Sequence, residues 1–279
     1  MSPAAKPSKS PKLPFWSTLG RAYGGVLRNF GFMLALFGRW LLVLLPIQIG
    51  WAWWIHPTLV AAIQSIFTGI AIKSSPWEPV AQIAVWLLML VPASIIAVGV
   101  HRRLLDGDVA AETYAPSEKI VRQLDGPVTG YVTAAAILMV IGAMPSVGFD
   151  LLPQTRYANV PAIGLAVFVA TWLVIAVTVR LSLALPAIAV QGPGQSFREA
   201  WAVTRRNTLR LCLGTMVSML PMIVVGLVTF GFAALISDRM VFALIGGILN
   251  SIGALFLVFS VAYLSYAWRH FWTTAPRQT

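Results

Sequence analysis

Charged side chains are scarce in this chain. Only 10% of its 279 residues are Asp, Glu, Lys or Arg, whereas 58% are hydrophobic. Because soluble domains carry about a quarter charged residues, this composition excludes an ordinary soluble domain and indicates a protein of the lipid bilayer. A membrane barrel is excluded too, since its strands are short segments of alternating hydrophobicity.

Cysteine and intramembrane carboxylates are also lacking. The single cysteine, Cys212, excludes an intramolecular disulfide and a cysteine-cluster metal site, and His56, His101 and His270 have no metal-ligand spacing. No Asp or Glu falls inside a long apolar run, which argues against proton-coupled transport. No phosphate-binding glycine loop, metal motif or nucleophilic triad spacing occurs. We therefore expect a non-enzymatic protein with no cofactor and no metal.

What the chain does contain is a series of long apolar stretches. A bilayer core about 30 Å thick needs roughly 20 apolar residues per helix. Stretches of this kind cover residues 30–54, 80–100, 128–149, 160–182, 211–235 and 241–267. The sequence therefore predicts an all-α integral membrane protein with six transmembrane helices. It forms a single domain over 14–279, after a disordered basic tail over 1–13.

Basic residues gather in some of the connections between these stretches. Seventeen of the 20 Lys and Arg fall in the N-terminal region, the connections after residues 100 and 182 and the C-terminus, which would all lie on one side of the membrane. The opposite side receives only Lys73, Arg156 and Arg239. This positive-inside pattern predicts a bacterial cytoplasmic (inner) membrane protein with both termini in the cytoplasm. Trp51, Trp53 and Trp54 then fall at the opposite interface, as an aromatic belt would. The scattered positions of the basic residues argue against nucleic-acid binding.

Three amphipathic stretches, at 14–30, 115–127 and 196–214, each precede a pair of spans. Helices of this kind lie in the membrane surface. The sequence LRN at 27–29 also echoes RRN at 205–207. We therefore expect three degenerate repeats of an amphipathic interfacial helix plus a helical hairpin. The apolar segment 58–72 is short, and either lies on the outer surface or forms part of a crossing.

Four arginines stand out in the third amphipathic stretch. Ser196 and Glu199 form a capping box, which predicts that a helix begins here. On a helical wheel, the arginines lie opposite or beside the side that holds Ala200 and Trp201. Facing the headgroups, they are either general anchors or a specific phosphate pocket that uses the fork of the guanidinium. The candidate lipid headgroup contacts are Arg198, Arg205, Arg206 and Arg210.

Two further polar residues form a candidate intramembrane polar site. Arg180 follows an apolar run that is already about 20 residues long, and is either a snorkelling anchor or a buried functional contact. Asn250 lies in the last span beside Gly247-x-x-x-Ser251, a small-residue packing pattern. Asn250 therefore belongs either to a helix contact or to a polar substrate contact.

Residues 181–221 contain Leu-Pro-x-Ile, Ser-x-x-x-Ala-Trp and Arg-x-Asn ahead of a span. The pattern falls on Leu185, Pro186, Ile188, Ser196, Ala200, Trp201, Arg205 and Asn207. It departs at Arg206, where a small residue is usual. In this respect the chain resembles bacterial YciC-like inner-membrane proteins and the membrane domain beside some glycerophosphodiester phosphodiesterases. The resemblance implies an inner-membrane protein of poorly defined role, and it supplies no catalytic residues because the phosphodiesterase domain is absent.

Together these features favour an accessory or scaffold protein of envelope or lipid homeostasis that contacts membrane phospholipids. The alternative is a small permease for an anionic or amphipathic solute, in which proline-kinked spans and Arg180 line a path. A homo-oligomer or a membrane-protein partner stays open in either case.

Overall fold

The computed structural model describes residues 12–68, 78–105, 126–150, 161–191 and 197–274. Its elements, in chain order, are α1 (Phe15–Arg28), α2 (Phe30–Thr68), α3 (Glu78–Leu105), α5 (Gly126–Asp150), α7 (Pro161–Ser182), α8 (Ala184–Gln191), α9 (Phe197–Thr204), α10 (Thr208–Ser218), α11 (Leu220–Leu235), α12 (Arg239–Phe256) and α13 (Val258–Thr274). Within the described residues, five helical segments are long and apolar enough to cross a membrane, or six when α10 and α11 form one bent span. The predicted all-α integral membrane fold is confirmed.

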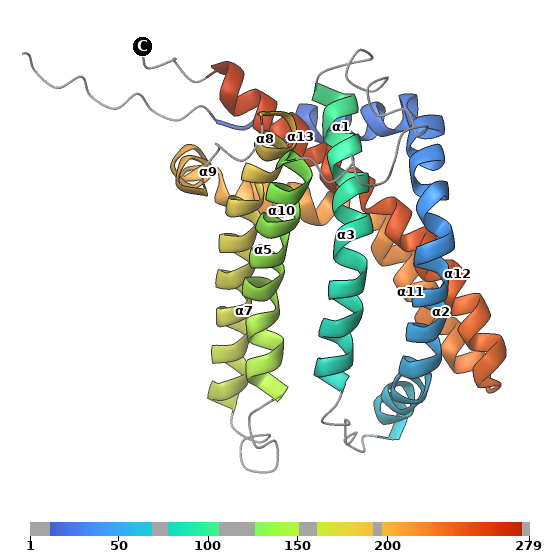
Figure 1. Ribbon diagram of the computed structural model, residues 1–279. Coiled ribbons are helices and arrows are strands. Elements are labelled where there is room, and N and C mark those ends of the chain that lie inside the picture. The colour runs from blue at the N-terminus through green and yellow to red at the C-terminus, as the bar shows by residue number, and fades with distance from the viewer. Residues whose placement is uncertain (1–11, 69–77, 106–125, 151–160, 192–196, 275–279) are drawn as a thin grey trace, which may run out of the picture.

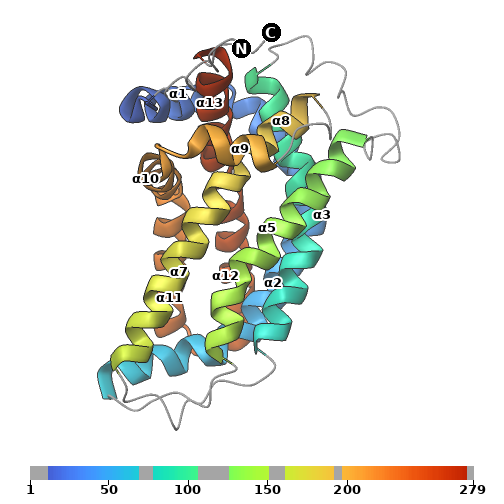
Figure 2. The same ribbon diagram turned by 90° about the vertical axis from the view of Figure 1, so that its left-hand side faces the viewer.

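The long helices run up and down between two ends of the molecule (Figure 1). α1, α8, α9, α10 and the last part of α13 gather at one end, which we call the packed end (Figure 2). The turn between α11 and α12 lies at the opposite end, which we call the far end. The light-blue end of α2 also lies there and runs sideways across the bundle (Figure 2). Segment 58–72 therefore continues α2 up to Thr68, and its last four residues fall outside the described ranges.

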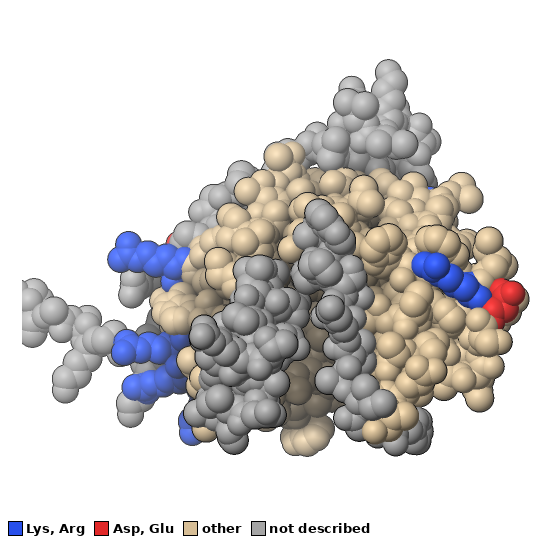
Figure 3. All heavy atoms as spheres, turned by 90° about the horizontal axis from the view of Figure 1, so that it is seen from below, with Lys and Arg blue, Asp and Glu red and all other residues tan. Residues whose placement is uncertain are grey.

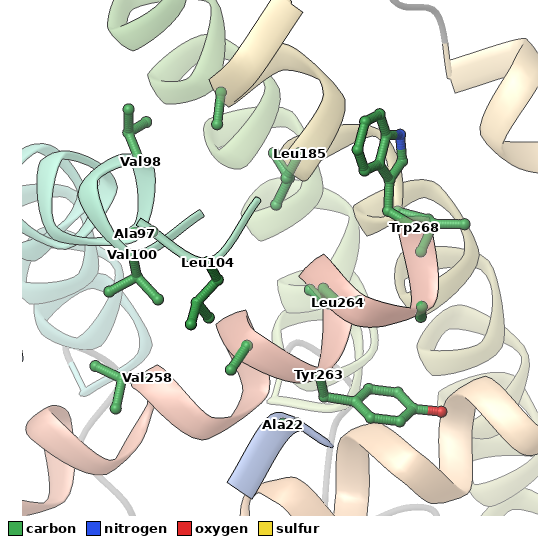
Figure 4. Packing of buried hydrophobic residues seen from close by; sticks show 14 of the residues in the cluster. Ala22, Ala97, Val98, Val100, Leu104, Leu185, Val258, Tyr263, Leu264 and Trp268 are labelled. Atoms are coloured by element: carbon green, nitrogen blue, oxygen red, sulfur yellow. The ribbon is translucent and has the colours of Figure 1, made fainter. Parts of the chain in front are cut away.

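The main hydrophobic core lies at the packed end and surrounds α13. Ala262, Tyr263 and Phe271 of α13 are completely buried. α1, α3, α8 and α10 all contact this helix, and Figure 4 shows Leu104 of α3 and Ala22 of α1 beside it. Small side chains such as those of Ala22 and Ala262 allow the helices to approach closely.

A second close approach joins α2 and α12 toward the far end. A Cβ atom on Gly247 would lie 2.8 Å from the Cα atom of Ile49, and one on Gly246 would lie 3.2 Å from the Cβ atom of Ala52. Ser251 is buried and donates its hydroxyl to the carbonyl of Gly247 at 2.9 Å. The predicted small-residue helix contact at Gly247-x-x-x-Ser251 is therefore confirmed.

The echo between LRN and RRN corresponds to two similar joints. Asn29 stands between α1 and α2 with φ −106° and ψ 19°, and Asn207 stands between α9 and α10 with φ −122° and ψ 9°. In each joint the next helix begins at the residue after the asparagine, although only Asn29 separates α1 from α2, whereas Arg205, Arg206 and Asn207 separate α9 from α10. This likeness supports a repeat relation between the first and third units. The amphipathic stretch of the second unit lies almost entirely outside the described residues.

The start of the folded part differs from the prediction, which placed residues 1–13 in a disordered tail. Leu13 is completely buried, and its backbone N–H donates to Asn207 Oδ1 at 2.8 Å. His270 Nε2 donates to the carbonyl of Lys12 at 3.2 Å. A leucine with a buried side chain and a bonded backbone belongs to the core, so the boundary lies before Leu13.

Candidate functional site

Arg180 fixes α9 onto the upper end of α7 (Figure 2). Its Nε donates to Thr204 Oγ1 at 3.0 Å and its Nη2 donates to the carbonyl of Trp201 at 2.5 Å. The guanidinium carbon lies 3.5 Å from the centroid of the Trp201 ring, in a cation–π contact. Arg180 is only 8% exposed. The residue is therefore a buried contact between two helices.

The four arginines of the third amphipathic stretch do not share one helix, as the wheel assumed. α9 ends at Thr204 and α10 begins at Thr208, so Arg205 and Arg206 lie in the turn between them. Asn207 ends this turn, and its side chain accepts the N–H of Leu13. Ser196, half of the expected capping box, lies outside the described residues.

The structure places all four arginines at the packed end with exposed side chains. Arg205 directly follows Thr204, whose hydroxyl oxygen accepts from Arg180, a residue that the sequence had suggested as part of a separate site. Beside the arginines, three apolar side chains are also exposed: Trp201 by 40%, Leu209 by 71% and Leu213 by 45%. A surface that combines guanidinium groups with exposed apolar side chains has the character of a membrane interface.

Arg210 differs from the other three arginines because it also holds the fold together. Its Nη1 donates to the carbonyl of Leu13 at 2.7 Å, and its own carbonyl accepts the hydroxyl of Tyr263 at 3.0 Å. Tyr263 can reach that carbonyl because Gly214, one turn further along α10, has no Cβ to block the ring. Arg210 is therefore in part a structural residue.

Most basic residues of the described chain lie at the packed end, on its helices, in the segments that adjoin them or at the adjoining end of α3. They are Lys12, Arg21, Arg28, Arg102, Arg103, Arg198, Arg205, Arg206, Arg210 and Arg269. Figure 3 views the molecule from below, and the described surface there is mostly tan, with blue atoms at the left margin and one blue side chain next to red atoms at the right. At the far end, Arg239 stacks its guanidinium 3.6 Å from the ring centroid of Trp53. Among the described residues, the two ends therefore differ in charge, and the orientation in the membrane stays a prediction.

A buried polar network that sequence reasoning missed joins α3, α5 and α13. His101 is completely buried, with Nδ1 2.7 Å from Ser265 Oγ and Nε2 3.2 Å from the Tyr131 hydroxyl. Ser265 donates its only hydroxyl proton to the carbonyl of Val261, so it accepts from His101 Nδ1–H. The neutral imidazole then accepts from Tyr131 at Nε2. The sequence feature that could have indicated this network is His101 itself, an ionisable residue directly after the apolar run 80–100.

Asn250 lies apart from Arg180, so the candidate intramembrane polar site divides into two places. Asn250 lines an open recess of about 230 Å³ between α2, α11 and α12. The other lining residues are Trp51, Ala52, Ile55, Leu59, Gly226, Thr229, Phe230 and Phe242. Apart from Thr229 and the indole N–H of Trp51, these lining side chains have no polar group. The Thr229 hydroxyl already donates to the carbonyl of Val225.

Among the described residues, no group of three or more His, Cys, Asp or Glu side chains could hold a metal ion. Cys212 is buried at the start of the fifth span. No family model, no curated protein and no solved structure matches the chain. The resemblance at residues 181–221 therefore stays a prediction, and what the structure establishes is a multi-pass helical membrane protein.

Proposed function

We propose that the chain is a non-enzymatic accessory or scaffold protein of a bacterial inner membrane, and that its packed end binds anionic phospholipids on the cytoplasmic side. The observation that carries this proposal is the joint between α9 and α10. There Arg205 and Arg206 are exposed close to the exposed apolar side chains of Trp201 and Leu209, and Arg198 is exposed in the first turn of α9.

The expected strength of this contact follows from simple electrostatics. Each Lys or Arg near an anionic membrane surface contributes about 1 kcal/mol. Three arginines therefore supply roughly 3 kcal/mol, which corresponds to a preference of about 100-fold for anionic over zwitterionic lipid. Trp201 and Leu209 place apolar groups at the same level, where acyl chains begin.

Native mass spectrometry of the protein, extracted gently from its own membrane, tests the proposal. We expect phosphatidylglycerol or cardiolipin to be retained in preference to phosphatidylethanolamine. The triple substitution of Arg198, Arg205 and Arg206 by Gln should abolish this preference. Retention of lipids in the proportions of the bulk membrane by the wild-type protein would overturn the proposal.

The permease alternative has less support. It required Arg180 to line a path for solute, but the Arg180 guanidinium stacks on Trp201 and donates to α9. A residue held in this way supports the joint at the packed end. Solute flux into vesicles that contain the wild-type protein, lost in an Arg180→Gln variant, would restore the permease.

A further inference from the structure

We infer that the recess between α2, α11 and α12 binds a neutral, lipid-soluble compound that carries a carbonyl oxygen on a ring, the class to which quinones belong. Asn250 and Trp51 donate hydrogen bonds to this compound, and its ring occupies the apolar part of the recess. The three helices lie side by side at the right of Figure 1. The inference goes beyond the proposed function, because the recess lies toward the far end and not among the arginines of the packed end.

The first support is a space of suitable size with close-packed walls. The recess holds about 230 Å³, and a cavity of about 150 Å³ with apolar walls is large enough for benzene. α2 and α12 form one wall without a gap, since a Cβ atom on Gly246 would lie 3.2 Å from the Cβ atom of Ala52. On the side of α11, a Cβ atom on Gly226 would meet nothing within 4 Å. The lack of a side chain at Gly226 therefore keeps the recess open.

The second support is a pair of N–H donors without an acceptor. The Asn250 amide lines the recess from α12, and the Trp51 indole lines it from α2. Neither side chain forms a hydrogen bond with the residues that the structure describes. An unpaired polar group is costly within the bilayer, because no water is present to satisfy it. A ligand carbonyl oxygen supplies the acceptor that these donors lack.

The third support is the depth of Asn250, which identifies the source of the ligand. The polar turn at Ser237 and Asp238 lies at the far end, where α12 begins. At a rise of about 1.5 Å per residue, Asn250 lies about 16 Å from the start of α12. A bilayer core is about 30 Å thick, so Asn250 lies near its middle. The ester carbonyls of phospholipids stay at the interface, whereas a lipid-soluble compound without a charged headgroup reaches this level.

The walls of the recess determine the remaining properties of the ligand. None of the lining residues carries a charge, so a charged ligand would be unpaired at this depth. Trp51, Phe230 and Phe242 place aromatic rings on the walls, and Phe242 is completely buried. Aromatic side chains pack against another ring in offset or edge arrangements that add to simple burial. A neutral ring with a carbonyl oxygen therefore suits both the walls and the donors.

Two glycines of α11 provide a matched pair of variants. Gly226→Leu should fill the recess and abolish binding. Gly231→Leu should bind like the wild type, because Gly231 also has open space around its Cβ position but does not line the recess. Asn250→Leu and Trp51→Phe remove one donor each and keep most of the side-chain volume. Loss of one hydrogen bond should weaken binding about tenfold.

The experiment is a titration of the full-length protein in neutral detergent with decylubiquinone, followed by native mass spectrometry. Decylbenzene, which has the same chain on a ring without oxygen, is titrated in parallel. We expect one decylubiquinone per protein molecule in the wild type and in Gly231→Leu. Decylbenzene should bind about 100-fold more weakly, since both hydrogen bonds are lost.

Four results would contradict the inference. Equal binding by Gly226→Leu and Gly231→Leu, or no saturable binding by the wild type, would overturn the location of the site. Unchanged affinity in both Asn250→Leu and Trp51→Phe would overturn the role of the donors, and this comparison remains decisive if Gly226→Leu does not fold. Equal affinity for decylbenzene would overturn the role of the carbonyl. Equal affinity for a straight-chain ketone would overturn the assignment to a ring.

Discussion

The packed end and the far end each contain a helix proline whose missing N–H frees a carbonyl, but different side chains bond to the two carbonyls. At the packed end, Pro221 cannot donate to the carbonyl of Val217. The hydroxyl of Tyr23, from α1, donates to that carbonyl at 2.9 Å. Burial raises the pKa of Tyr23, so the hydroxyl keeps the proton that it donates. α10 and α11 bend by 49° at this point.

At the far end, Pro57 leaves the carbonyl of Trp53 without its helical donor. Arg239 Nε donates to this carbonyl at 2.7 Å, while its guanidinium stacks on the Trp53 ring. Trp53 is 43% exposed. A charged donor at an exposed position suits an interface that water can reach, whereas the neutral, partly buried Tyr23 suits the protein interior.

The two ends also differ in how their histidines and cores are arranged. At the packed end, His101 uses both ring nitrogens inside a large hydrophobic core. At the far end, His56 Nε2 donates to the carbonyl of Ile236 at 3.0 Å beside a small cluster of buried residues that contains Phe242. We conclude that the packed end determines most of the stability, so changes there should have the larger effects.

The largest effect is expected from Gly214→Ala at the packed end. A Cβ atom there overlaps the ring of Tyr263, which is completely buried and cannot move aside. We expect the free energy of unfolding to fall by about 3 kcal/mol, the upper part of the range for overpacking. Unfolding in mixed micelles with increasing sodium dodecyl sulfate measures this change.

Gly231→Ala in α11 is the matched control. A Cβ atom there meets nothing within 4 Å. This variant should equal or exceed the wild type in stability, because alanine is a better helix former than glycine by up to about 1 kcal/mol. Equal stability of the two variants would show that the packed end is not tightly packed around Tyr263.

The second prediction concerns the hydrogen bond between Tyr23 and Val217. Tyr23→Phe leaves this carbonyl without a donor, and we expect a loss of about 1 kcal/mol. In a Pro221→Ala background, the N–H of residue 221 can bond to Val217 itself, so Tyr23→Phe should then cost almost nothing. A double-mutant cycle in mixed micelles measures the difference. The same cost in both backgrounds would contradict the role assigned to the hydroxyl.

Hydropathy and charge were sufficient to predict the helical class, the membrane-spanning segments, which number five, or six when α10 and α11 count as one, and the different charge of the two ends among the described residues. These are properties of single segments, because each segment that crosses the bilayer must be apolar and must satisfy its own backbone hydrogen bonds whatever its neighbours are. The LRN and RRN echo also indicated two equivalent joints, because asparagine suits the backbone between consecutive helices. The orientation in the membrane and the resemblance stay predictions.

The candidate site was predicted only in pieces because its geometry depends on contacts between distant segments. The wheel over 196–210 assumed an uninterrupted helix, but α9 ends at Thr204, and Asn207 in the turn that follows bonds to Leu13, which is 194 residues away in the chain. The contact of Arg180 with Trp201 likewise depends on how α9 folds back onto α7. No spacing rule indicated that His101, Tyr131 and Ser265 would meet.

The smallest effect is expected from Arg239→Met at the far end. This substitution keeps an unbranched, largely apolar stem and removes both the donor to the Trp53 carbonyl and the cation–π contact with the Trp53 ring. Comparing it with the same substitution in a Pro57→Ala background isolates the hydrogen bond, because the ring contact is lost in both. We expect a coupling of about 0.5 kcal/mol, since water can reach this carbonyl when Arg239 is removed. A coupling equal to or larger than that between Tyr23 and Pro221, measured in the same micelles, would show that the far end excludes water as well as the packed end does.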